Sequence, residues 1–179
     1  TMANKRSVAL AENRELIPRR FEEALPIPLR GDFLKRSSQD RIHSSDNQQH
    51  PANRFQVDFW NALNSNQWIS ASAPTSAGKS FLLRLWVAEV FRKSKGALVA
   101  FIVPTRALIQ EFSDGFSQDV ANGVLKNVTL HSLPIEEEFA TNSGHLFIFT
   151  QERLHILLSR RKDLGFTLLV VDEAQKVGD

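Results

Sequence analysis

The sequence contains no cysteine among its 179 residues, which excludes disulfide bonds and thiolate metal sites. Long hydrophobic runs are also missing. The longest covers residues 97–103, and these seven residues are far fewer than the roughly 20 that a membrane-spanning helix needs. The start of the sequence lacks the basic, apolar and small-residue layout of a secretory signal, so we expect no such signal. These absences favour an intracellular protein, cytoplasmic or nuclear, without a membrane partner.

A strong excess of one charge sign is missing as well. The formal net charge is +2, and 42% hydrophobic with 23% charged residues is an ordinary globular composition, which excludes a wholly disordered chain. The basic residues are unevenly distributed: residues 1–54 hold ten Lys and Arg against seven Asp and Glu, whereas residues 55–179 hold twelve against thirteen. This small excess does not indicate nucleic-acid binding by itself, although it leaves that function open for the front of the chain.

The pattern of apolar residues changes near residue 54. This change predicts two parts of the chain, residues 1–53 and residues 54–179. Residues 9–17 have a weak helical stripe that prolines interrupt, and residues 37–50 contain one apolar residue, Ile42. We interpret the first part as an irregular or partly helical extension that ends in a linker or mobile loop. Its role is open; residues 1–50 could dock a protein partner.

The second part alternates apolar strands with helices. The expected helices cover residues 54–63, 78–93, 106–120 and 151–161, and the expected strands cover residues 68–71, 97–103, 127–131, 145–149 and 167–171. The strands are continuously apolar rather than alternating, which is typical of a parallel sheet with helices on both faces. The sequence therefore predicts an α/β fold, with Trp60, Trp68 and Trp86 in its core.

Residues 73–80 read Ala-Pro-Thr-Ser-Ala-Gly-Lys-Ser, a near match to the phosphate-binding pattern G-x-x-x-x-G-K-[ST] with alanine in the first position. A loop that opens a helix directs backbone N–H groups at an anion, and the helix dipole favours negative charge there. We expect Lys79 to meet the β and γ phosphates of a nucleotide and Ser80 to meet Mg²⁺. The full expected nucleotide-binding set is Ala73, Pro74, Thr75, Ser76, Ala77, Gly78, Lys79 and Ser80. An ordinary Pro/Ser/Gly turn is the alternative.

An acidic pair follows the last predicted strand, 93 residues beyond Lys79. Carboxylates at the carboxyl end of a buried parallel strand face the crevice where ligands of such sheets bind. Asp172 is expected to hold Mg²⁺, partly through water, and Glu173 to orient the water that attacks the γ-phosphate. A solvated turn is the alternative. The five histidines show no spacing typical of a metal site.

These two elements together resemble the superfamily 2 helicases of the DExD/H type. Gln56, 17 residues before Ala73, has the spacing of that family's adenine-reading glutamine. Residues 104–108 look like motif Ia, residues 150–154 like motif Ib with Gln151 in place of proline, and residues 172–175 like motif II. The amino-acid sequences of residues 73–80 and 150–161 are similar to those of the superkiller-like branch. The resemblance implies a RecA-like ATP-binding domain over residues 54–179, with ATP and Mg²⁺ as cofactors.

The resemblance also assigns the remaining candidate residues. It implies that Thr105, Arg106 and Thr150 contact a nucleic-acid backbone, which gives affinity rather than sequence readout. Motif II reads DEAQ, and its fourth residue, Gln175, would couple to a second motor domain. Family members continue into a motif III strand and a second RecA-like domain with an arginine finger. We therefore expect the chain to be part of a longer motor and, alone, to be inactive.

Taken together, these features predict the N-terminal ATP-binding part of an ATP-dependent helicase acting on a single-stranded tract of RNA or DNA. Two alternatives stay open: a translocase or remodelling motor that does not separate strands, and a non-catalytic interaction module with a structural nucleotide site.

Overall fold

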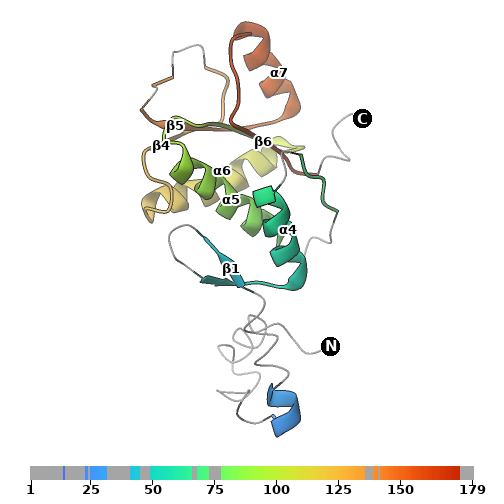
Figure 1. Cartoon of the computed structure of the whole chain (residues 1–179). Helices are drawn as coiled ribbons and strands as arrows, with labels where there is room; N and C mark the ends of the chain where they lie inside the picture. Colours follow the sequence, from blue (N-terminus) through green and yellow to red (C-terminus); the bar gives the residue numbers. More distant parts are fainter. Residues whose placement is uncertain are drawn as a thin grey trace. The chain divides into compact units, whose positions relative to one another are not determined.

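The computed structural model describes residues 14, 23, 25–31, 41–44, 49–65, 68–72, 78–135, 139–140 and 142–173. The chain divides into two compact units, Thr1–Leu82 and Leu83–Asp179, which are treated separately below (Figure 1). The helix expected at residues 9–17 lies outside the described residues except for Arg14.

A β-hairpin precedes helix α4 (Arg54–Ser65) in the first unit. Strands β1 (Arg41–His43) and β2 (Gln49–Pro51) pair antiparallel, with Ile42 opposite His50. The interpretation of residues 37–50 as a linker or mobile loop was therefore wrong for the residues that form these strands. Ile42 explains the error: this single apolar side chain is only 1% exposed, so one buried residue anchors a hairpin that its polar composition concealed.

Helix α4 (Arg54–Ser65) follows the hairpin and confirms the helix expected at residues 54–63, with two more residues at its end. It buries Gln56 and Trp60, four residues apart on one face. Asn53 and Gln56 form a reciprocal cap: the Asn53 N–H donates to Gln56 Oε1 at 3.0 Å, and the Gln56 N–H donates to Asn53 Oδ1 at 2.9 Å. This capping box satisfies two helix-start donors and fixes where α4 begins.

The expected strand at residues 68–71 was wrong. Residues 68–72 have no regular secondary structure, and Trp68 is 89% exposed instead of lying in the core. A strand needs a neighbour for its backbone N–H and C=O groups, and no described strand pairs with this segment. Helix α5 (Lys79–Lys93) begins seven residues after it and confirms the helix expected at residues 78–93.

The second unit contains a parallel four-stranded sheet in the order β4-β5-β3-β6. Its strands and helices match the expected elements within two residues. The strands are β3 (Leu98–Ile102), β4 (Val128–His131), β5 (Gly144–Phe149) and β6 (Leu168–Val171), and the helices are α6 (Arg106–Ala121) and α7 (Gln151–Arg160).

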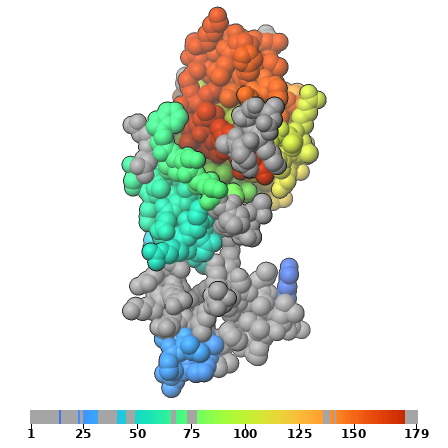
Figure 2. Space-filling view, turned by 90° about the vertical axis from the view of Figure 1, so that its right-hand side faces the viewer, coloured from blue at the N-terminus to red at the C-terminus, as the bar shows by residue number. Residues whose placement is uncertain are grey.

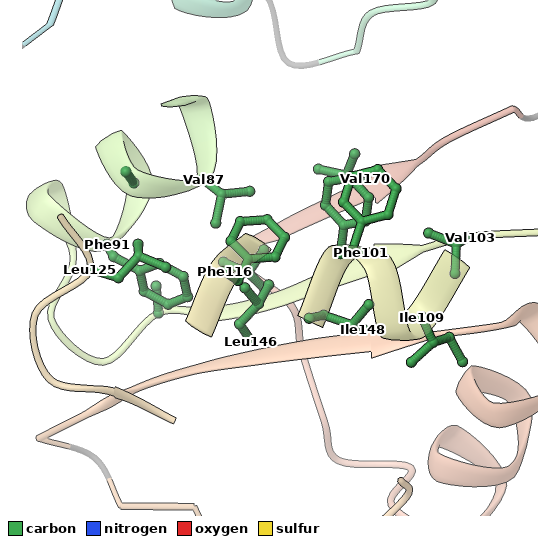
Figure 3. Close-up of a cluster of buried hydrophobic side chains, with 14 residues drawn as sticks. Val87, Phe91, Phe101, Val103, Ile109, Phe116, Leu125, Leu146, Ile148 and Val170 are labelled. Atoms are coloured by element: carbon green, nitrogen blue, oxygen red, sulfur yellow. The ribbon is translucent and has the colours of Figure 1, made fainter. Parts of the chain in front are cut away.

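Helices cover both faces of this sheet, as the apolar strand pattern predicted (Figure 1). On one face, side chains of α5 and α6 pack on β3, β5 and β6 in a single cluster that includes Phe101, Phe116 and Ile148 (Figure 3). On the other face, Leu157 of α7 packs with Phe147 and Phe149. All six residues of β5 are buried, which explains the absence of alternation in its sequence.

The edge of the sheet at β6 is less well covered. Among the described strands, β6 pairs with β3 alone, and Leu169 and Val171 on its α7-side face are 50% and 39% exposed. Leu168 and Val170 point to the opposite face, where they pack against the cluster under α5 and α6. The space-filling view shows α7 and the chain that leads into β6 at the surface (Figure 2).

Two histidines are stacked where β4 and β5 lie side by side. The His131 and His145 rings are 5.2 Å apart, with 2.9 Å between His131 Nε2 and His145 Nδ1. His145 Nε2 lies 3.3 Å from the Ala140 carbonyl oxygen, which can only accept. Burial, and then the neighbouring His145, lower the pKa of His131 from 6.5 to about 4.

Candidate functional site

The start of α5 carries the part of the expected phosphate site that the structure describes. Gly78 has φ 75°, a left-handed conformation that glycine adopts without the steric cost of a side chain. Lys79 and Ser80 form the first turn of α5, where Lys79 is half-buried and Ser80 exposed. Residues 73–77, from Ala73 to Ala77, lie outside the described residues. The binding of phosphate by this turn stays a prediction.

Gln56 lies against this turn. A Cβ built on Gly78 would meet the side-chain amide nitrogen of Gln56, so the two residues are in close contact and glycine is required for space as well as for φ. Gln56 is 4% exposed and already accepts the Asn53 N–H. The structure therefore brings the predicted adenine-reading residue to the phosphate turn. The adenine contact itself stays a prediction.

The acidic pair follows β6 directly. The Asp172 N–H donates to the Ile102 carbonyl at 2.9 Å, which fixes the backbone of Asp172 to the end of β3. The Asp172 carboxylate in turn accepts the Glu173 N–H at 3.1 Å. Glu173 has φ 50°, which is unusual for a residue with a side chain and costs about 1–3 kcal/mol. Strain of this kind concentrates at functional sites, and the sequence gives no signal for it.

Three strand ends meet at one edge of the sheet. Ile102 of β3 pairs with Phe149 of β5 on one side and with Val171 of β6 on the other. Because the strands are parallel, the residues that follow them emerge at the same edge. The structure therefore brings three expected groups side by side: Thr105 with Arg106, Thr150, and Asp172 with Glu173.

Thr105 caps helix α6. Its side chain accepts the Leu108 N–H at 3.4 Å, which positions the start of the helix and places Arg106 in the first helical residue. Arg106 is exposed, so its guanidinium can reach an anion in solvent. Helices α6 and α7 both begin at this edge of the sheet, and the free N–H groups of a helix start favour an anion such as a phosphate.

Thr150 lies at the start of α7, and its contact with nucleic acid stays a prediction. It precedes α7 but is only 6% exposed, and its side chain caps no N–H of the helix. Instead, its hydrogen bond to the Glu152 carboxylate lowers the pKa of Glu152; the Glu152 backbone N–H and the charge of Arg106 act in the same direction. The sequence analysis did not include Glu152 among the site residues. Its position as an acidic residue in the first turn of a predicted helix could have indicated it.

Ser80 and Asp172 offer hydroxyl and carboxylate oxygens, the donor type that Mg²⁺ prefers. Asp172 is half-buried and directly follows β6, and Ser80 is exposed in the first turn of α5. Within the described ranges, no three His, Asp or Glu side chains gather in a group that could hold a metal without a nucleotide. Gln175 lies outside the described residues. No helix among the described residues has the length and apolar character of a membrane span.

The parallel sheet with helices on both faces places the second unit in the RecA-like class of α/β folds. A family model of the DEAD/DEAH box helicases matches residues 53–179, and the chain belongs to this family of ATP-dependent helicases and ATPases. Comparisons with curated proteins and with solved structures found no significant match.

Proposed function

We propose that the chain is the ATP-binding part of a nucleic-acid motor that couples Mg-ATP hydrolysis to movement along, or unwinding of, RNA or DNA. The motor would belong to superfamily 2 and to its superkiller-like branch, because the amino-acid sequences of residues 73–80 and 150–161 resemble that branch. The membership in the DEAD/DEAH box family supports the general activity. The observation that carries the site assignment is the left-handed Glu173 directly after the Asp172 backbone is fixed to β3.

In this proposal, Lys79 neutralises the β and γ phosphates, and the backbone N–H groups of residues 75–80 bind the same oxygens. Ser80 and Asp172 would hold Mg²⁺, which supplies charge neutralisation at the phosphates when it is bound. Glu173 orients the attacking water, and its backbone N–H donates to the Asp172 carboxylate. Gln56 reads the adenine, and Gln175 couples to a second RecA-like domain of the full-length motor.

The nucleic-acid surface in this proposal comprises the starts of α6 and α7. Arg106 supplies the side-chain cation, while Thr105 acts through the helix start that it caps. Thr150 is buried and bonded to Glu152, so we propose that it contributes through the backbone of α7 rather than through its hydroxyl. Contacts of this type set affinity and register without sequence preference.

The test is binding of Mg-ATP to the purified chain, measured with a fluorescent ATP analogue. Lys79→Ala should abolish binding because it removes the cation nearest the phosphates, while circular dichroism stays unchanged. Lys95→Ala is the matched control, since Lys95 is exposed in the turn after α5. Equal binding by wild type and Lys79→Ala would refute the nucleotide site. Absence of binding by the wild type would refute the proposed nucleotide site as well.

A further inference from the structure

The β1–β2 hairpin touches the first turn of α5. The imidazole of His50 in β2 meets the ring of Phe81 edge to face, with 5.8 Å between the ring centroids and 69° between their planes. His50 is half-buried and lies opposite Ile42, the buried anchor of the hairpin. An edge-to-face pair at this distance is within the favourable range for aromatic contacts. The hairpin is therefore attached to the helix at a defined point.

This contact lies next to the proposed phosphate-binding residues. Phe81 follows Ser80 directly, and on the other side of Lys79 the Gln56 side chain packs on Gly78. The Leu82 N–H donates to the Gly78 carbonyl at 3.2 Å and closes the turn. The first N–H groups of a helix have no partner within it, so a helix start frays more readily than its middle. Contacts on both sides of Lys79 oppose that fraying.

We propose that His50 is a positioning residue for the nucleotide site: by holding Phe81, it fixes the first turn of α5 and with it the directions of Lys79 and Ser80. The inference rests on the proposed role of Lys79 and Ser80 in binding phosphate. It gives the β1–β2 hairpin, which precedes the residues matched by the family model, a function in ATP binding.

The first experiment measures amide hydrogen exchange in the whole chain without nucleotide, with the Leu82 amide as reporter. An aromatic pair is worth about 0.5–1.5 kcal/mol, so His50→Ala should speed Leu82 exchange about two- to tenfold. His50→Phe keeps a ring against Phe81 and should restore the wild-type rate. His43→Ala is the matched control because His43 is exposed on the same hairpin. Amides in the middle of α5 should not change in any variant.

The second experiment measures the dissociation constant of Mg-ATP for the same variants. His50→Ala should weaken binding two- to tenfold, whereas His50→Phe and His43→Ala should bind as the wild type does. Should His50→Ala fail to fold, Phe81→Leu removes the ring while keeping an apolar side chain and should give the same Leu82 acceleration.

The outcomes separate the two proposals. A wild type that binds no nucleotide refutes the proposed function, while the exchange experiment still decides the role of His50. Unchanged Leu82 exchange in a folded His50→Ala variant overturns the positioning role. Uniform acceleration along all of α5 also overturns it, because it would show that His50 contributes only to overall stability.

Discussion

Acidification should destabilise the second unit through His131. Its pKa is about 4 in the folded chain against 6.5 for an ordinary histidine, because the ring is partly buried and lies against His145. The unfolded chain therefore binds more protons than the folded chain between pH 4 and 6.5. The contribution of His131 to stability is fully present above pH 6.5 and is lost as the pH falls toward 4.

The magnitude follows from the difference between the ordinary pKa of 6.5 and the pKa of about 4 in the folded chain. At about 1.36 kcal/mol per unit, the upper bound is about 3.4 kcal/mol over the whole interval. His131 is only partly buried, so solvent screening reduces this to about 2 kcal/mol. Between pH 7 and pH 5, where the transition is incomplete, we expect a loss of about 1 kcal/mol from this residue.

The assay is urea unfolding at pH 7 and pH 5, for wild type and His131→Phe. Phenylalanine keeps the stack on Phe147, where the ring centroids are 4.8 Å apart, but it cannot take up a proton. The variant should lose about 1 kcal/mol less than the wild type on acidification. The control is His155→Ala, since His155 is exposed on α7. Equal pH dependence in wild type and His131→Phe, or an NMR titration midpoint of His131 near 6.5, would refute this reasoning.

Further predictions concern four other residues. In a protein that includes the proposed second RecA-like domain, Glu173→Gln should keep ATP affinity and slow single-turnover hydrolysis on the order of 10²–10⁴-fold; weaker binding with unchanged hydrolysis per bound nucleotide would contradict its proposed role. Arg106→Ala should weaken single-strand binding for all sequences and lower the salt dependence by about one ion, and identical salt slopes would make it a surface residue. Gly144→Ala should cost about 1–3 kcal/mol in urea unfolding, because its Cβ would meet the Phe91 ring. Arg84→Met should cost about 1–2 kcal/mol by removing the 2.7 Å ion pair to Asp119, and a neutral result would show that this pair adds nothing.

The sheet and its helices could be predicted because their signals are local. A continuously apolar strand such as residues 97–103 must be buried on both faces, and a capping residue such as Thr105 marks where a helix begins. The strand expected at Trp68 was wrong because strand formation depends on a pairing partner that the segment itself does not encode. The β1–β2 hairpin was missed because backbone pairing and one buried isoleucine are enough to form it, although its sequence is mostly polar.

The candidate site shows the same limit. Residue types and spacing indicated Lys79, Asp172 and Glu173, because phosphate and Mg²⁺ chemistry restricts the side chains that can serve. The left-handed backbone of Glu173 and the contact of Gln56 with Gly78 depend on tertiary packing, for which sequence spacing carries no signal. Neither feature could be read from the chain without its fold.

Gln56 takes part in two structures at once. Its side-chain oxygen caps the start of α4, and its side-chain nitrogen packs on Gly78 at the start of α5. Thermodynamic reciprocity then applies: if a nucleotide draws the Gln56 amide toward its base, the cap on α4 must weaken, and any substitution of Asn53 that loosens the cap must alter nucleotide affinity. Nucleotide binding would thus change the stability of the first turn of α4 without any movement of a whole domain.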